Sequence, residues 1–260
     1  MNSAPNLINE GEYANVKGSD FRVMSLVGIA HFFSHFYIYL LPPLFPFLKT
    51  ALNVSYTELG LLMAVFSGTT GLTQIPFGFL VDRFGAKFIL IAGLAVEGIA
   101  FSCMGFAPGY PFLVALMFLA GAANGVYHPA DYAILSASVS KTRMGRAFSL
   151  HTFGGYAGFA VAGPVIIFLN STIGWSLGLL ICGVAGIGTA FVLMLYSRDL
   201  KHTVQRKDNV IDQKTKTKSS ADSGVKLLLS PPILMCLVFF TLLSLAVSYT
   251  HLTLPTKRIV

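Results

Sequence analysis

The segment GFLVDRFGAKFIL, from Gly78 to Leu90, places a short polar turn between two long apolar runs. Gly78 is suited to close packing at the end of the first run, and Gly85 to a tight reversal into the second, because glycine lacks a Cβ atom. Asp82 stands where a carboxylate can accept hydrogen bonds from the exposed amides of a helix N-terminus. The segment therefore predicts two helices joined by a tight turn.

The solvent around these helices follows from composition. Apolar residues make up 54% of the 260 residues and charged residues only 11%, and the mean hydropathy is +0.70. Soluble domains carry about 25% charged residues. The three cysteines lie inside apolar runs without the spacing of a metal or disulfide site, so we interpret them as small hydrophobes. The predicted fold class is an all-α polytopic membrane protein, and we expect no cofactor.

Six apolar segments are each long enough to cross a bilayer, which takes about 20 residues. They run over 22–48, 57–80, 86–106, 111–137, 147–169 and 173–196. We divide the chain into a cytoplasmic N-terminus (1–21), a six-helix half (22–196), a cytoplasmic loop (197–230) and the start of a seventh helix (231–246).

The basic residues predict the orientation of these spans. Lys and Arg number two in the N-terminal segment, two in the second connection, three in the fourth and eight in the sixth, whereas the opposite side has Lys49 alone. The positive-inside rule places the N-terminus and these connections in the cytoplasm. We therefore interpret the net charge of +7 as membrane anchoring and expect no nucleic-acid partner. No cleavable signal peptide is visible, and we expect a multi-pass protein of the inner (cytoplasmic) membrane.

The last residues, 247–260, are polar and break the seventh apolar run. Their first part, VSYTHLTLPT, can be back-translated into DNA that resembles a transposon-end adapter of sequencing libraries. We expect this tail to be non-native, and the chain to be a fragment that does not transport by itself.

The turn resembles the loop signature of the major facilitator superfamily, G-x-L-x-D-R-x-G-x-K. Its matching positions are Gly78, Leu80, Asp82, Arg83, Gly85 and Lys87. The resemblance implies the N-terminal six-helix half of a transporter, monomeric at full length, in which this loop is a cytoplasmic gate and Asp82 latches onto the other half. The HFFSHF, LLPPLFPFLK and HP stretches look somewhat like the fosmidomycin-resistance type of efflux carrier. Met117 stands where many members have arginine, and Gly154–Pro164 matches a family Gly-Pro bend loosely.

Ionisable residues inside spans cost on the order of 3 kcal/mol each and are functional candidates by default. The candidates for a substrate and proton path are His31, His35, Tyr39, Asn124, His128, Asp131 and His151. The first three recur every four residues and share one face. The resemblance implies that this face lines the central cavity, and aromatic packing is the competing interpretation. Glu97 lies in the third span, which is peripheral in the family, so we expect it to pair structurally or to reach toward the headgroups.

Asp131 and His151 lie 11 residues before and 9 residues after the centre of one connection, near Thr142. They should sit at similar depth and compensate each other's desolvation. With His128 one turn from Asp131, the set is either a proton relay or a polar clip between two helices, and Pro129 loosens the helix beside it.

The leading hypothesis is secondary active transport of a small molecule by alternating access, coupled to protons. The spans hold no deep Lys or Arg, which argues against an anionic substrate and favours efflux of amphipathic compounds or uptake of a neutral or zwitterionic metabolite. One alternative is a membrane enzyme with a His/Asp metal site, which is disfavoured because these residues are spread over two helices at different depths. The other is a transporter-like sensor without transport.

Overall fold

The computed structural model describes residues 10–198, 200, 229–239 and 241–242, with side chains from residue 18 onward. Most of the expected loop 197–230 and the whole expected tail 247–260 lie outside the described residues. The chain divides into two compact units, Met1–Arg206 and Lys207–Val260. In the second unit, residues 231–239 are helical, within the range expected for the start of a seventh helix.

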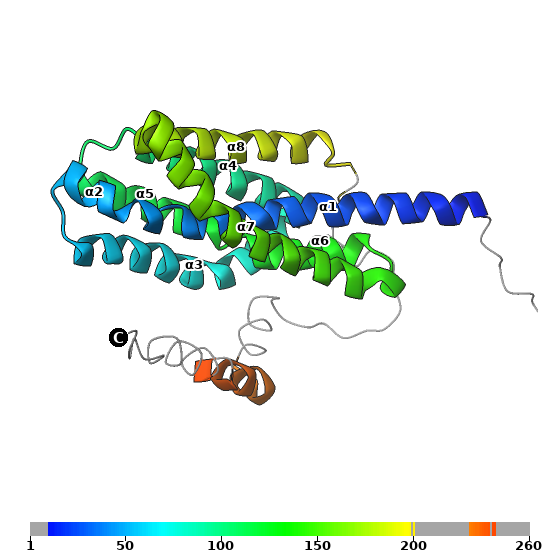
Figure 1. Cartoon of the computed structure of the whole chain (residues 1–260). Helices are drawn as coiled ribbons and strands as arrows, with labels where there is room; N and C mark the ends of the chain where they lie inside the picture. Colours follow the sequence, from blue (N-terminus) through cyan, green and yellow to red (C-terminus); the bar gives the residue numbers. More distant parts are fainter. Residues whose placement is uncertain (1–9, 199, 201–228, 240, 243–260) are drawn as a thin grey trace, which may run out of the picture. The chain divides into compact units, whose positions relative to one another are not determined.

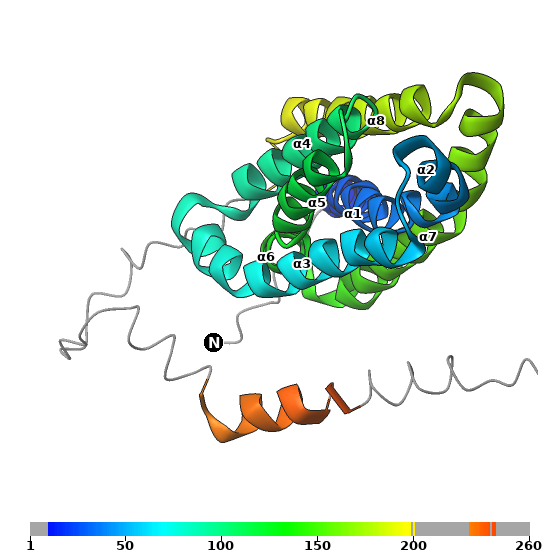
Figure 2. The same cartoon turned by 90° about the vertical axis from the view of Figure 1, so that its left-hand side faces the viewer.

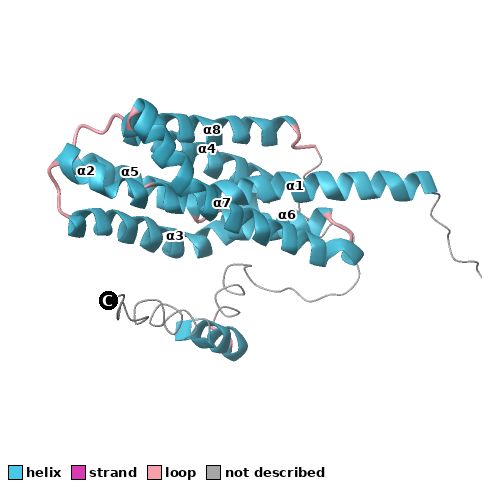
Figure 3. Ribbon diagram, viewed as in Figure 1, coloured by secondary structure: helices cyan, strands magenta, loops and turns pink. Residues whose placement is uncertain are grey.

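Every regular element in these described ranges is a helix (Figure 3). In chain order the elements are α1 (Glu10–Leu40), η1 (Pro42–Leu44), α2 (Phe45–Leu52), α3 (Tyr56–Phe84), α4 (Ala86–Met104), α5 (Tyr110–Asn124), α6 (Tyr127–Ser138), η2 (Lys141–Arg143), α7 (Met144–Ile173) and α8 (Trp175–Leu195). The all-α polytopic class is thereby confirmed.

In the part of the chain that the structure describes, five helical segments are long and apolar enough to cross a membrane. They cover Gly18–Leu52, Ala86–Met104, Tyr110–Ser138, Lys141–Ile173 and Trp175–Leu195. The expected span 57–80 corresponds to α3, which has 29 residues but is less apolar than these five. Two of its polar side chains have partners on α5: Thr70 Oγ1 donates to Gly121 O and Thr73 Oγ1 to Ala122 O.

The turns between consecutive helices follow local sequence signals. Ser55 caps α3 and forms a capping box with Glu58. Gly85 joins α3 to α4 with φ of +93°, and Gly174 joins α7 to α8 with φ of +85°, values that favour glycine. The expectation of close packing at Gly78 was wrong within the described residues, because a Cβ atom there would have no neighbour within 4 Å.

The first unit is a bundle in which α1 runs near the middle (Figures 1 and 2). Its most extensive packing partner is α7, while α4 packs on α8 and α3 on α5. The α1–α7 crossing is close at Gly154, where a Cβ atom would lie 2.5 Å from Gly28 O. This crossing brings together residues 100 positions and more apart in the sequence, including the candidate site.

The expected fourth span is divided into two helices, α5 and α6, at Gly125 and Val126. Val126 N donates to Ala123 O, three residues back, so the backbone tightens at this point. Pro129 has no N–H to donate toward Gly125, which leaves the ladder open one turn later. The interruption lies directly before the residues of the candidate site, His128 and Asp131.

Candidate functional site

Asp131 is the centre of a buried polar cluster built from three helices. Its side chain on α6 is fully buried, and its Oδ2 lies 3.1 Å from His31 Nδ1 of α1 and 3.1 Å from His151 Nε2 of α7. The two imidazole rings stack with centroids 3.6 Å apart. The proximity of Asp131 and His151 agrees with the prediction that they lie at similar depth. His31 joins them because α1 packs along α7.

The polar cluster around Asp131 contains no fixed charge from the described residues. Its ionisable members are one carboxyl group and imidazoles, and neither Lys nor Arg is among the partners of Asp131 in the described part of the chain. A buried carboxylate without a cation is costly, so an ionised Asp131 requires a proton on a neighbouring imidazole. If the Asp131 carboxyl group is protonated instead, neither the His31 nor the His151 imidazole needs to carry a proton.

His128 and His35 lie beside the cluster without joining its hydrogen bonds. The His128 ring is 5.2 Å from the His31 ring and 6.3 Å from the His151 ring, and the His35 ring is 4.6 Å from the His31 ring. Three buried atoms here have no hydrogen-bond partner among the described residues: His35 Nδ1, His128 Nδ1 and Asp131 Oδ1. The cluster thus has polar capacity left for a substrate, for water or for protons.

The row expected on the first span runs from the buried cluster toward the surface. His31 is 3% exposed, His35 is half-buried, and Tyr39 is 53% exposed. Phe159 of α7 contacts both His35 and Tyr39, with ring centroids 4.3 Å and 4.9 Å away. Aromatic packing therefore occurs along the same helix face that carries the row of His31, His35 and Tyr39.

Asn124 belongs to a second polar network, which sequence reasoning missed. Its Nδ2 donates to Glu97 Oε1 at 2.9 Å and to Ser34 Oγ at 3.1 Å, and Tyr127 OH donates to Glu97 Oε2 at 2.8 Å. Glu97 is fully buried, so its side chain does not reach toward the headgroups. The available signal was the pair of polar residues that flanks Gly125 and Val126 on the neighbouring span.

Three imidazoles, those of His31, His128 and His151, each place one ring nitrogen within 4.8 Å of the others. The sequence indicated different depths for these residues, but the structure places the three imidazoles together. Two nitrogens bound to one tetrahedral zinc ion are about 3.4 Å apart. His31 and His151 also already direct one nitrogen each to Asp131. This arrangement favours hydrogen bonding to Asp131 over metal binding.

The gate motif has a different environment. Asp82 is exposed and makes no hydrogen bond or ion pair with other described residues, while the Arg83 guanidinium lies 5.3 Å from the Phe84 ring centroid. Gly85 and Lys87 stand at the start of α4. A nearby interaction at the same end of the bundle was missed: Asp20 Oδ2 accepts from Arg143 Nε at 2.8 Å and from Ser140 N at 3.0 Å.

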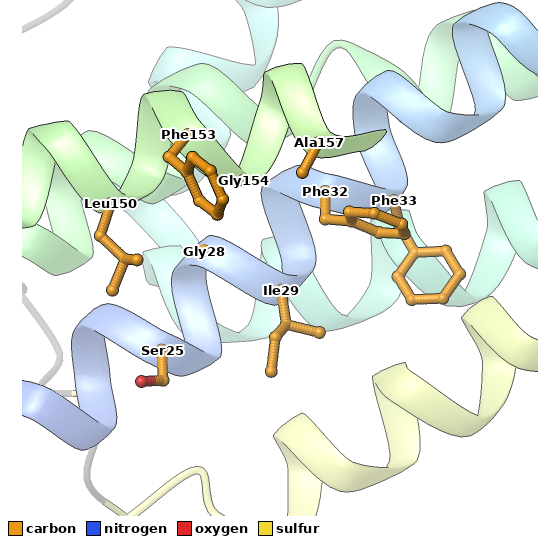
Figure 4. Close-up of a pocket in the computed structure, with 9 residues that line it drawn as sticks. All are labelled: Ser25, Gly28, Ile29, Phe32, Phe33, Leu150, Phe153, Gly154 and Ala157. Atoms are coloured by element: carbon orange, nitrogen blue, oxygen red, sulfur yellow. The ribbon is translucent and has the colours of Figure 1, made fainter. Parts of the chain in front are cut away.

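A pocket of about 430 Å³ lies between α1 and α7 (Figure 4). Gly28 and Gly154 form its floor at the helix crossing, and exposed Ile29 and Phe153 stand at its sides. Ser25 is the one hydroxyl-bearing residue of its lining. Ligand sites combine apolar walls with several converging polar groups, which this pocket lacks. The polar cluster around Asp131 remains the candidate site.

Comparisons with known proteins agree with this architecture. The "Probable sulfoacetate transporter SauU" of Cupriavidus necator is 25% identical over 155 residues, covering 59% of this chain and 36% of the relative. The "Probable galactarate/D-glucarate transporter GudP" of Escherichia coli K12 is 28% identical over 140 residues, covering 52% and 31%. The chain thus spans about a third of the length of these curated relatives.

A solved structure shares the fold. A bacterial homologue of the human lysosomal transporter Spinster, in an inward-facing and unoccupied conformation, matches with a TM-score of 0.64 and 19% identity. The match covers 77% of this chain and 46% of that one. The family description "Major Facilitator Superfamily" matches residues 27–258, most of the chain. With this match, the helical bundle and the gate motif, the chain belongs to the major facilitator superfamily: it is a multi-pass membrane protein of a transporter family, not an enzyme.

Proposed function

We propose that the full-length protein is a proton-coupled secondary transporter that works by alternating access, with Asp131 as its proton site and His31 and His151 as its proton-exchanging partners. The observation that supports this most directly is the fully buried Asp131 Oδ2, held at 3.1 Å by imidazoles from two other helices. The protein lies in the inner membrane with a cytoplasmic N-terminus, and works as a monomer.

Coupling requires that proton binding and substrate binding influence each other at one place. The unpartnered atoms His35 Nδ1, His128 Nδ1 and Asp131 Oδ1 provide that place. A substrate that satisfies them changes the charge environment of Asp131, and a proton on Asp131 changes the groups offered to the substrate. His128 and His35 are partly buried, so the substrate reaches them from the open side of the cluster.

The proposed substrate class is a small organic acid. SauU and GudP are named for sulfoacetate and for galactarate and glucarate, all of which are acids. The sequence argument against an anion considered only Lys and Arg. A protonated imidazole also provides a cation, and binding a proton would then create the charge that a carboxylate or sulfonate needs. Proton and acid would move together, so the direction is uptake.

The test uses the full-length natural protein in proteoliposomes with radiolabelled sulfoacetate and D-glucarate. An inward proton gradient should drive accumulation of at least one acid in the wild type. Asp131→Asn should abolish accumulation but keep exchange of labelled for unlabelled substrate across the membrane, because exchange needs no net proton movement. The exchange assay also shows that the variant is folded.

Gradient-driven accumulation that persists in Asp131→Asn would refute the proton site. The substrate class would be refuted if wild-type vesicles accumulated neither acid. The protein density in these vesicles must be high enough to give measurable exchange of another solute. A transporter-like sensor would bind an acid without accumulating it.

A further inference from the structure

Glu97 joins the two halves of the interrupted fourth span. Its Oε1 accepts from Asn124, the last residue of α5, and its Oε2 accepts from Tyr127, the first residue of α6. One carboxyl group of α4 therefore bridges the break at Gly125 and Val126. Both oxygens have a donor, and the side chain is fully buried.

The bridge also reaches α1. Asn124 Nδ2 donates to Ser34 O at 3.2 Å and to Ser34 Oγ at 3.1 Å. Ser34 follows His31 by three residues, and Asp131 follows Tyr127 by four, so each lies about one helical turn from the bridge. The network thus fixes α1 against α6 close to the contact between His31 and Asp131.

Within the described residues, the other side-chain hydrogen bonds that hold the α5 side of the break come from α3. Thr70 and Thr73 donate to the carbonyls of Gly121 and Ala122, which satisfies the C-terminal end of α5. These bonds do not touch α6. Among the described residues, the side chain that hydrogen-bonds to both α5 and α6 is Glu97, so it controls how the second half of the span is oriented.

We propose that Glu97 is a positioning residue: it locks the joint between α5 and α6 and thereby sets the distance from Asp131 to His31. This inference rests on the proposed role of Asp131 in proton coupling. Glu97 does not carry the transported proton. Among the described residues, the titratable groups that face it are Tyr127 of α6 and Tyr37 of α1, and no imidazole there hydrogen-bonds to it.

Substitution by glutamine separates positioning from proton carriage. In Glu97→Gln, the amide oxygen can still accept from Asn124, and the amide nitrogen can donate to the Tyr127 oxygen. The bridge survives although no proton can be exchanged. Glu97→Ala removes the bridge, and Tyr127→Phe removes only its α6 arm. Glu58→Gln is a matched control, because Glu58 is an exposed carboxylate at the start of α3.

Two measurements on the full-length protein test the proposal. Hydrogen–deuterium exchange of the 125–131 amides should rise about tenfold in Tyr127→Phe and more in Glu97→Ala, since the loss of a buried hydrogen bond lowers local stability. Exchange in Glu97→Gln and Glu58→Gln should match the wild type. In proteoliposomes, the pH of half-maximal uptake should shift in Tyr127→Phe and stay unchanged in Glu97→Gln.

Unchanged amide exchange in Tyr127→Phe would overturn the proposal that Glu97 locks the joint between α5 and α6. If Glu97→Ala does not fold, the result for Tyr127→Phe is sufficient by itself. Loss of gradient-driven uptake in Glu97→Gln would overturn positioning in favour of proton carriage. The exchange measurement involves no transport. A failure of the Asp131 proposal therefore leaves the lock at the α5–α6 joint as a separate, measurable result.

Discussion

Replacing Gly154 with alanine should destabilise the crossing that builds the candidate site. The added Cβ atom would lie 2.5 Å from Gly28 O, whereas ordinary contacts begin near 3.4 Å, so α1 and α7 must separate by about 0.9 Å. The obstacle is backbone, so no side-chain rotation relieves it. Overpacking of this kind costs about 1–3 kcal/mol. Alanine's better helix propensity returns up to about 1 kcal/mol, which leaves a net loss of about 1 kcal/mol.

The same displacement should disable the site. Gly28 precedes His31 by three residues, and Gly154 follows His151 by three, so a shift at the crossing is transmitted to both imidazoles. Contacts of 3.1 Å to Asp131 Oδ2 would lengthen toward 4 Å, beyond hydrogen-bonding distance. Gradient-driven uptake should fall at least tenfold.

Stability is measured by unfolding of the purified full-length protein in increasing SDS, followed by circular dichroism at 222 nm. Gly145→Ala is the control, because a Cβ atom at this position of the same helix meets nothing within 4 Å. Its free energy of unfolding should stay within about 0.5 kcal/mol of the wild type. If Gly154→Ala unfolds at the same SDS concentration as Gly145→Ala, the steric reasoning is refuted.

Two further substitutions test the ends of the helices by the same unfolding measurement. Ser55→Ala removes the cap that accepts from Glu58 N, and should cost about 1 kcal/mol, against less than about 0.5 kcal/mol for Ser149→Ala; equal effects would contradict the capping box. Arg143→Met leaves buried Asp20 without its cation and should cost about 3 kcal/mol, of which Asp20→Asn in the same chain recovers part; the absence of recovery would contradict the ion pair.

Local and sequential features of the fold were predictable from the sequence. Gly85 marks a reversal because its conformation is a property of one residue and its neighbours. Asp131 and His151 could be paired by counting, since consecutive spans run antiparallel and the depth of each residue follows from its distance to the turn.

Contacts between non-consecutive spans were not predictable in this way. His31 meets Asp131 because α1 packs along α7, an arrangement that depends on small residues such as Gly28 and Gly154 rather than on any periodic pattern. Glu97 pairs structurally, which is one of the two outcomes expected, but the sequence does not show which face of α4 meets Asn124 and Tyr127. His128 is one turn from Asp131, but proximity along a helix did not make it a hydrogen-bond partner.

The origin of the Asp131 cluster in three separate helices also bears on how the protein is made. Spans enter the membrane in the order of synthesis, so α6 arrives after α1 but before α7. An aspartate at the centre of a span opposes insertion by roughly 3 kcal/mol. His31 is already in the bilayer when α6 inserts and can hydrogen-bond to Asp131. His151 follows later. His31 would therefore stabilise Asp131 both during membrane insertion and in the folded protein. His151 would stabilise it only in the folded protein.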